Sequence, residues 1–267
     1  MYIDEQKYWF YNLDRWEEKS MNSKLKITKI ELDRAKISDF NIYPFNIEII
    51  KSFKKLEFKK NVTFFIGENG IGKSTLIEAL AIALGLPPEG GTQNFMFSTK
   101  NTSSDLYKYL RIREENKAQT KFFLRAESFY NFSTEVQRLV EEDGYIKLYN
   151  SYGGNLHECS HGESFLNLVK NRFSENGLYI LDEPEAALSP TRQMSLLYLI
   201  DELSKNGSQF IISTHSPILI SYRDGEILDL SDNFKSVEYK DTDIYKIYKA
   251  YLDNPDLMQK RLFNEYS

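Results

Sequence analysis

The stretch Gly67-Glu68-Asn69-Gly70-Ile71-Gly72-Lys73-Ser74 decides the fold of this 267-residue chain. It matches the pattern G-x-x-x-x-G-K-[ST], in which backbone N–H groups curl around phosphate oxygens and the following helix points its positive end at them. A β-branched and aromatic run, residues 62–66, comes directly before it, and a helical pattern follows over residues 73–84. Strand, glycine loop and helix in this order predict a phosphate-binding loop for a nucleoside triphosphate.

Each part of this loop has an expected role. The Lys73 ammonium can reach the β- and γ-phosphates, and the Ser74 hydroxyl can ligate Mg²⁺. The nucleotide-binding residues predicted here are Gly67, Asn69, Gly70, Gly72, Lys73, Ser74 and Thr75.

A second pattern is the apolar run of residues 178–181, which ends in two carboxylates, Asp182 and Glu183. A strand that ends beside a phosphate loop delivers its last residue to the metal, so we expect Asp182 to hold Mg²⁺ through water. Glu183 would polarise an attacking water. A carboxylate at this position repels a triphosphate, so we expect it to have a role that offsets this cost. This favours hydrolysis over binding alone.

Two further motifs can be interpreted either as chemical sites or as purely structural features. Ser160 and Gly162 stand at the start of an expected helix, where a hydroxyl and free N–H groups form an anion site; a capping box of Ser160 with Glu163 is the alternative. His215 follows the apolar strand of residues 209–213 and could reach a γ-phosphate or donate to a water. A histidine without a chemical role is the alternative there.

Strands alternate with helices along residues 25–267, which argues for an α/β fold with a mainly parallel sheet. The stretches on either side of the strand Lys121–Arg125 exceed a simple crossover, so we expect a helical insertion over roughly 89–172. Residues 1–24 are rich in aromatic side chains and would form an arm that packs on the domain or contacts a partner. At the other end, residues 221–267 should give an edge strand and helices that cover the sheet.

Composition limits the classes of protein that the chain can be. The net charge of −5 argues against electrostatic nucleic-acid binding by the whole chain, although a local basic patch is compatible with it. The single cysteine, Cys159, suits a reducing compartment. The longest apolar stretch falls far below the roughly 18 residues of a membrane span. We therefore expect a soluble, cytoplasmic protein without a leader or a membrane-inserted segment.

The order of these motifs along the chain resembles that of the ATP-binding-cassette (ABC) ATPases, and within them the soluble branch that includes SMC, RecF and OLD proteins. The segments Ile66–Ala79 and Leu181–Pro190 are similar to that branch. More narrowly, Arg125–Ser128 and the Ser-His-Gly-Glu signature at Ser160–Glu163 resemble small ATPases labelled as AAA family. The resemblance spans about residues 25–263.

This resemblance implies a P-loop ABC-type ATPase head that works as a head-to-tail homodimer. ATP with Mg²⁺ would lie between the phosphate loop of one subunit and Ser160 and Gly162 of the other, with Glu183 as the catalytic base and His215 as the switch histidine. Glu127 stands where the family has a glutamine that contacts the metal, so it is a candidate metal ligand. Tyr43 and Phe45 are candidates for stacking on adenine.

The first functional hypothesis is an ATP-driven dimerisation switch in DNA repair or in defence against foreign DNA. DNA, a nuclease or another effector would be its partner, and basic residues between 108 and 125 could face DNA phosphates, although a solvated helix face explains them as well. The alternatives are the ATPase subunit of an ABC membrane transporter, and a low-turnover ATP-sensing partner of a nuclease or toxin.

Overall fold

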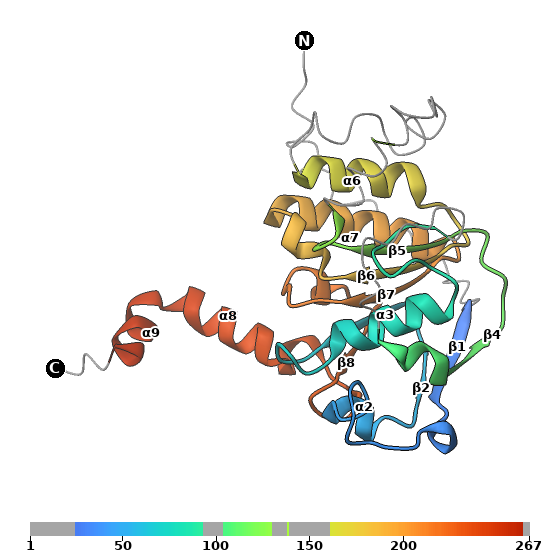
Figure 1. The fold of residues 1–267 in the computed structure, drawn as a ribbon. Helices are drawn as coiled ribbons and strands as arrows, with labels where there is room; N and C mark the ends of the chain where they lie inside the picture. The colour runs from blue at the N-terminus through green and yellow to red at the C-terminus, as the bar shows by residue number, and fades with distance from the viewer. Residues whose placement is uncertain (1–24, 93–103, 130–137, 139–160, 264–267) are drawn as a thin grey trace, which may run out of the picture.

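The computed structural model describes residues 25–92, 104–129, 138 and 161–263. These residues form two β-sheets, and helices cover both faces of the larger one (Figure 1). Among the described helices, none combines the length and the apolar character needed to cross a membrane. The N-terminal arm predicted over residues 1–24 lies outside the described residues.

The larger sheet has six strands in the order β5-β6-β7-β3-β8-β9, and all neighbours are parallel except the last pair. Every residue of β3, β6 and β7 is buried, as expected for central strands of a parallel sheet with both faces covered. The carboxyl ends of the parallel strands meet at one edge, which carries the site described below. The strands are β3 Val62–Ile66, β5 Lys121–Arg125, β6 Leu178–Asp182, β7 Gln209–Ser213, β8 Glu226–Asp229 and β9 Lys235–Ser236.

The two faces of this sheet contact different helices because successive strand side chains point to opposite sides. Phe65 of β3 packs in the cluster that contains α3, whereas Phe64 packs in the cluster that contains α6 and α7. The phosphate-loop helix therefore lies on one face, and the other two helices lie on the opposite face (Figure 1). Their bounds are α3 Lys73–Ala83, α6 His161–Arg172 and α7 Pro190–Lys205.

The smaller sheet is antiparallel, with the order β2-β1-β4, and its core side joins the α3 cluster. We expected a helical insertion over roughly 89–172, but a strand, β4, lies in that range. It forms because β1, about 80 residues earlier in the chain, offers it a pairing edge. The elements are β1 Ile27–Leu32, α2 Glu48–Ser52, β2 Lys55–Glu57 and β4 Leu110–Glu114.

The expected insertion over residues 89–172 is described only in part. Its described residues hold β4, β5 and α6, and its remaining residues lie outside the description. The extent of a helical insertion therefore stays a prediction. Short 3-10 helices join the larger elements: η1 Arg34–Lys36, η2 Asp105–Tyr109, η3 Pro184–Ala187, η4 Leu219–Ser221 and η5 Tyr239–Asp241.

Helix α7 begins with a capping serine followed by a proline. The Ser189 hydroxyl accepts a 3.4 Å bond from the backbone N–H of Arg192, and proline occupies the first turn. Leu196 and Ile200 are buried on its inner face. Met194 is 47% exposed, because it lies away from the 3.6-residue stripe that those two residues define.

The prediction that the C-terminal helices cover the sheet is wrong. Helices α8 (Asp243–Asp253) and α9 (Pro255–Leu262) extend away from the two sheets (Figure 1), and neither contains a buried residue. The reason is that α3, α6 and α7 already occupy the faces of the larger sheet. The strand that we expected at the edge, β8, lies one position further in, because β9 pairs with its outer side.

Candidate functional site

The glycine loop connects β3 to α3 at the carboxyl edge of the larger sheet. Gly72, the residue before the helix, has φ +109°, a conformation that residues with a Cβ rarely adopt. A Cβ on Gly72 would lie 2.7 Å from a methyl carbon of Ile47, so the segment before α2 closes tightly on the loop. Asn69 and Gly70, at the tip of the loop, are exposed, and Thr75 is half-buried in the first turn of α3.

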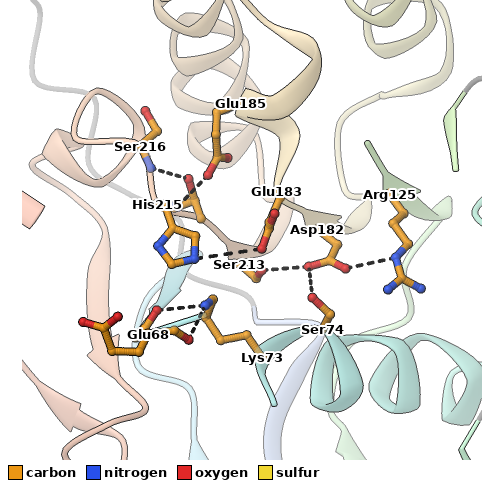
Figure 2. A network of polar contacts seen from close by, with 12 residues as sticks. Glu68, Lys73, Ser74, Arg125, Asp182, Glu183, Glu185, Ser213, His215 and Ser216 are labelled. Atoms are coloured by element: carbon orange, nitrogen blue, oxygen red, sulfur yellow. Dashed lines mark hydrogen bonds and ion pairs between the residues drawn. The ribbon is translucent and has the colours of Figure 1, made fainter. Parts of the chain in front are cut away.

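Lys73 is buried, and its side chain folds back into the loop. Its Nζ donates to the carbonyl oxygens of Gly67, at 2.8 Å, and Glu68, at 3.0 Å. Burial lowers the pKa of Lys73 below its ordinary value, while the carboxylates of Glu183 and Asp182 act in the opposite direction. The ammonium thus lies where the loop would surround a phosphate (Figure 2).

Asp182 ends β6 beside the first turn of α3. Its Oδ1 accepts from the Ser213 hydroxyl at 2.8 Å and from the Ser74 hydroxyl at 3.3 Å. The side chain is only 3% exposed, and burial raises the pKa of Asp182. The predicted pair of metal ligands, Ser74 and Asp182, is therefore brought together.

This pair of oxygen donors fits Mg²⁺, which prefers hard oxygen ligands and is usually bound through one or two carboxylates together with substrate phosphates. Among the described residues, no group of three or more His, Cys, Asp and Glu side chains could hold a metal ion. A Mg²⁺ ion held by Ser74 and Asp182 would complete its coordination with water and nucleotide oxygens.

The backbone turns sharply at Glu183, directly after β6. Its φ of +49° is unusual for a residue with a side chain, and its N–H donates to the carbonyl of Ser213 at 3.0 Å. Such conformations cost on the order of 1–3 kcal/mol and cluster at functional sites. The carboxylate is 42% exposed, and its Oε1 lies 3.9 Å from Nε2 of His215. The turn therefore leaves this carboxylate open to water at the site edge.

His215 stands after β7 and is held through its backbone. Its N–H donates to Oε1 of Glu185 at 2.5 Å, and burial raises the pKa of that glutamate. Burial, followed by the Lys73 charge, lowers the pKa of His215 below its ordinary value, which favours the neutral imidazole. Nε2 of His215 has no hydrogen-bond partner among the described residues.

Glu127 lies at the turn after β5. Its carboxylate is 85% exposed and pairs at 3.7 Å with Nε of Arg125. The structure thus places Glu127 beside Arg125, and its contact with a metal stays a prediction.

The signature residues are described in part. Ser160 lies outside the described residues, whereas Gly162 is buried in the first turn of α6. A Cβ on Gly162 would lie 2.8 Å from the carbonyl oxygen of Ala187, so this turn packs against η3. Because α6 packs in the cluster of Phe64, Gly162 belongs to the sheet face opposite to α3.

The two candidates for stacking on adenine differ in exposure. Phe45 is 5% exposed and packs edge-to-face against Tyr109 in the core, so it offers no ring face to a nucleotide. Tyr43 is 62% exposed in the segment that leads to Ile47, the residue against Gly72. Of the two, only Tyr43 stays a candidate for stacking on adenine.

Sequence reasoning missed four residues that support the site. One of them, Arg125, pairs with Asp182, and the parallel register of β5 and β6 puts these two residues opposite each other. Only strand pairing supplies that signal, because the two positions are far apart in the chain. The other three contact Arg125, Asp182 or the backbone of His215. The four residues are Glu78, Arg125, Glu185 and Ser213.

A phosphate loop, a buried lysine and an acidic strand end at the carboxyl edge of a parallel sheet define a P-loop ATPase fold. Two family models match this chain. The model described as "ABC transporter" matches residues 55–186, which include the phosphate loop and Glu183. The model described as "AAA domain, putative AbiEii toxin, Type IV TA system" matches residues 160–221, which include Asp182 and His215.

Similar proteins carry transport names. The chain is 28% identical to "ABC transporter G family member STR2" of Medicago truncatula over 58% of this chain and 24% of that protein. It is 24% identical to "Uncharacterized ABC transporter ATP-binding protein" of Haemophilus influenzae over 77% of this chain and 84% of that protein. The chain thus spans about a quarter of the first relative and most of the second.

Among solved structures, the chain is similar to an "SMC head domain from Thermotoga maritima", with 16% identity and a TM-score of 0.39 over 76% of this chain and 95% of that one. The fold is therefore that of a P-loop ABC-type ATPase, and its relatives imply ATP hydrolysis. The resemblance to ABC ATPases is confirmed at that level, and the narrower SMC, RecF and OLD branch stays a prediction.

Proposed function

We propose that this domain binds ATP with Mg²⁺ on the glycine loop and hydrolyses it there with Glu183 as the base. The observation that carries the proposal is the meeting of Lys73, the Ser74–Asp182 pair and Glu183 at one sheet edge. Residues 25–267 would form this ATPase domain, with the insertion over roughly 89–172.

The proposed role of each residue follows from the charge or donor groups of its side chain. Lys73 would contact the β- and γ-phosphates, and Ser74 and Asp182 would hold Mg²⁺, which when bound neutralises phosphate charge. Glu183 would orient a water whose oxygen attacks the γ-phosphorus. The bond from that phosphorus to the bridging oxygen breaks, a water proton passes to the Glu183 carboxylate, and ADP and inorganic phosphate leave.

Phosphate release tests this assignment. Glu183→Gln should lower the turnover number by about 100-fold or more, because it removes the proton acceptor, while ATP binding is retained. Glu57→Gln, an exposed glutamate of the small sheet, is the matched control and should behave as the wild type. Equal turnover in the two variants would remove Glu183 from the mechanism.

We also propose that two copies pair head to tail, as ABC ATPase domains typically do. The first turn of α6 lies on the sheet face opposite to α3, which suits a signature serine that serves the nucleotide of another subunit. Light scattering of the Glu183→Gln protein with ATP and Mg²⁺ should give twice the monomer mass. Adding Ser160→Arg should restore the monomer, and a monomeric Glu183→Gln protein would contradict the pairing.

Three biological roles fit an ABC-type ATPase domain. The transport names of its relatives favour the ATPase subunit of a membrane transporter. The toxin-related family model favours a low-turnover partner of a nuclease or toxin. A cytoplasmic dimerisation switch in defence or DNA repair is the third candidate role. Against DNA contact, Arg111 and Lys121 are paired with Asp33 and Glu114. Arg111 lies on strand β4, so a solvated helix face does not explain that residue.

Cell fractionation separates these roles. When the chain is expressed with its genomic neighbours, co-purification with a multi-span membrane protein would establish the transporter role. Recovery in the soluble fraction, together with nucleotide-dependent dimers, would establish the switch. Phosphate release by the wild type but not by Glu183→Gln would exclude the low-turnover sensor.

A further inference from the structure

Arg125, the last residue of β5, lies opposite Asp182, the last residue of β6, in the parallel register of the two strands. We propose that Arg125 is a positioning residue that fixes the metal-binding carboxylate of Asp182. This inference rests on the proposed function, because it takes Ser74 and Asp182 as the ligands of Mg²⁺.

Besides its contact with the exposed Glu127, the guanidinium of Arg125 joins two largely buried carboxylates on different elements. NH1 donates to Oε2 of Glu78 on α3 at 2.8 Å, and Nε lies 3.3 Å from Oδ2 of Asp182 (Figure 2 shows the contact with Asp182). The Arg125 side chain is 21% exposed and that of Glu78 is 16% exposed. These contacts are therefore largely shielded from water and should hold their geometry better than a surface ion pair.

The contacts of Asp182 divide between its two oxygens. Oδ1 accepts from the hydroxyls of Ser74 and Ser213, while Oδ2 faces Arg125. Rotation of the carboxylate would break contacts at both oxygens at once. Arg125 thereby keeps Oδ1 turned toward Ser74, which is the arrangement that the metal pair requires.

Glu78 couples this arrangement to the phosphate-loop helix. It stands four residues after Ser74 on α3, so the two side chains share one helix face. The same helix supplies the metal-binding hydroxyl and the anchor for Arg125. A backbone bond from the Ala126 N–H to the Asp182 carbonyl, 3.1 Å long, ties the ends of β5 and β6 together as well.

The chemistry of arginine suits this role. Its planar guanidinium presents donors in a fixed fork and stays charged, whereas a lysine offers a single point charge. Groups that orient a metal ligand typically change metal affinity by about 10- to 100-fold when they are mutated. We therefore expect Arg125 to act on Mg²⁺ affinity more than on nucleotide affinity.

The test uses the full chain with Glu183→Gln to stop hydrolysis and a fluorescent N-methylanthraniloyl ATP as probe. Mg²⁺ is titrated, and its half-maximal concentration for probe binding is measured; Mn²⁺ binding by electron paramagnetic resonance gives a second readout. Arg125→Gln should raise the half-maximal concentration by at least about 10-fold, with Arg125→Lys and Glu78→Gln in between. Probe binding without metal should not change.

Arg111→Gln is the matched control, because it breaks an arginine contact with a buried aspartate, Asp33, at 2.7 Å in the smaller sheet. It should titrate as the parent does. A parent-like titration of Arg125→Gln, or an equal loss of metal-free probe binding, would overturn the proposal. If Arg125→Gln does not fold, a parent-like titration of Arg125→Lys and Glu78→Gln overturns it.

Asp182→Asn in the same assay separates this inference from the proposed function. If Asp182→Asn weakens Mg²⁺ binding but Arg125→Gln does not, only the role of Arg125 fails. If the parent and Asp182→Asn titrate alike, the proposed metal site fails, and the positioning role of Arg125 fails with it.

Discussion

At the scale of single residues, the site surrounds one buried ammonium with carboxylates. The charges of Glu183, Asp182, Glu185 and Glu68 all act on Lys73. A triphosphate that approaches Lys73 must therefore also approach several negative groups. This explains in electrostatic terms why a divalent cation would be needed for tight nucleotide binding.

The pH dependence of His215 follows from its surroundings. Because burial and Lys73 lower its pKa below 6.5, we expect its NMR titration midpoint to fall below that value in the nucleotide-free protein. Between the folded and unfolded pKa values the unfolded state binds more protons, so this histidine reduces stability as the pH falls through that window. ATP should raise the midpoint, since phosphate charge favours the imidazolium.

The chain has three histidines, so the signal that disappears in His215→Gln identifies this residue. The titration is measured in the Glu183→Gln protein with and without ATP and Mg²⁺. A midpoint at or above 6.5 without nucleotide, or a downward shift with ATP, would contradict the placement of His215 beside Lys73.

At the scale of elements, the close contact between Gly72 of the glycine loop and Ile47 gives a stability prediction. Gly72→Ala would strain a φ of +109° and push its methyl against Ile47, whereas Gly70 has φ +79° and no atom within 4 Å of its added Cβ. Gly70→Ala should lower the free energy of unfolding by about 1–2 kcal/mol from backbone strain alone. Gly72→Ala should lower it further and weaken ATP binding.

Urea denaturation of the two variants gives this comparison, and calorimetry gives their ATP affinity. Equal losses of stability would mean that the contact between Gly72 and Ile47 does not constrain the loop.

The elements also show what a sequence can predict. Strands β3, β6 and β7 were predictable because buried parallel strands are continuous apolar runs between turn signals. Strand β4 was not, since its partner β1 is distant in sequence and its own side chains are mostly polar. Likewise, the motif spacing predicts Lys73 and Asp182, but the contact of Arg125 with Asp182 depends on strand register.

At the scale of the whole molecule, the C-terminal helices are an extension of the fold rather than part of its core. Removing residues 247–267 keeps Ile244, which packs on the core, and takes away no buried residue among those described. We expect the melting temperature to change by less than about 2–4 °C, the shift that 1 kcal/mol produces in a domain of this size.

Differential scanning calorimetry of the shortened and full-length chains measures this change. Replacing Phe165, a fully buried residue of α6, by alanine is the control for a real loss of packing and should lower the melting temperature clearly. A similar drop on shortening would show that α8 and α9 support the core.

The most direct measurement for the whole account is a crystal structure of the Glu183→Gln protein with ATP and Mg²⁺. We predict the γ-phosphate at Nζ of Lys73, the metal between Ser74 and Asp182, and Ser160 of a second subunit on the same nucleotide. A nucleotide bound away from the glycine loop, or a metal that contacts neither Ser74 nor Asp182 directly or through water, would contradict it.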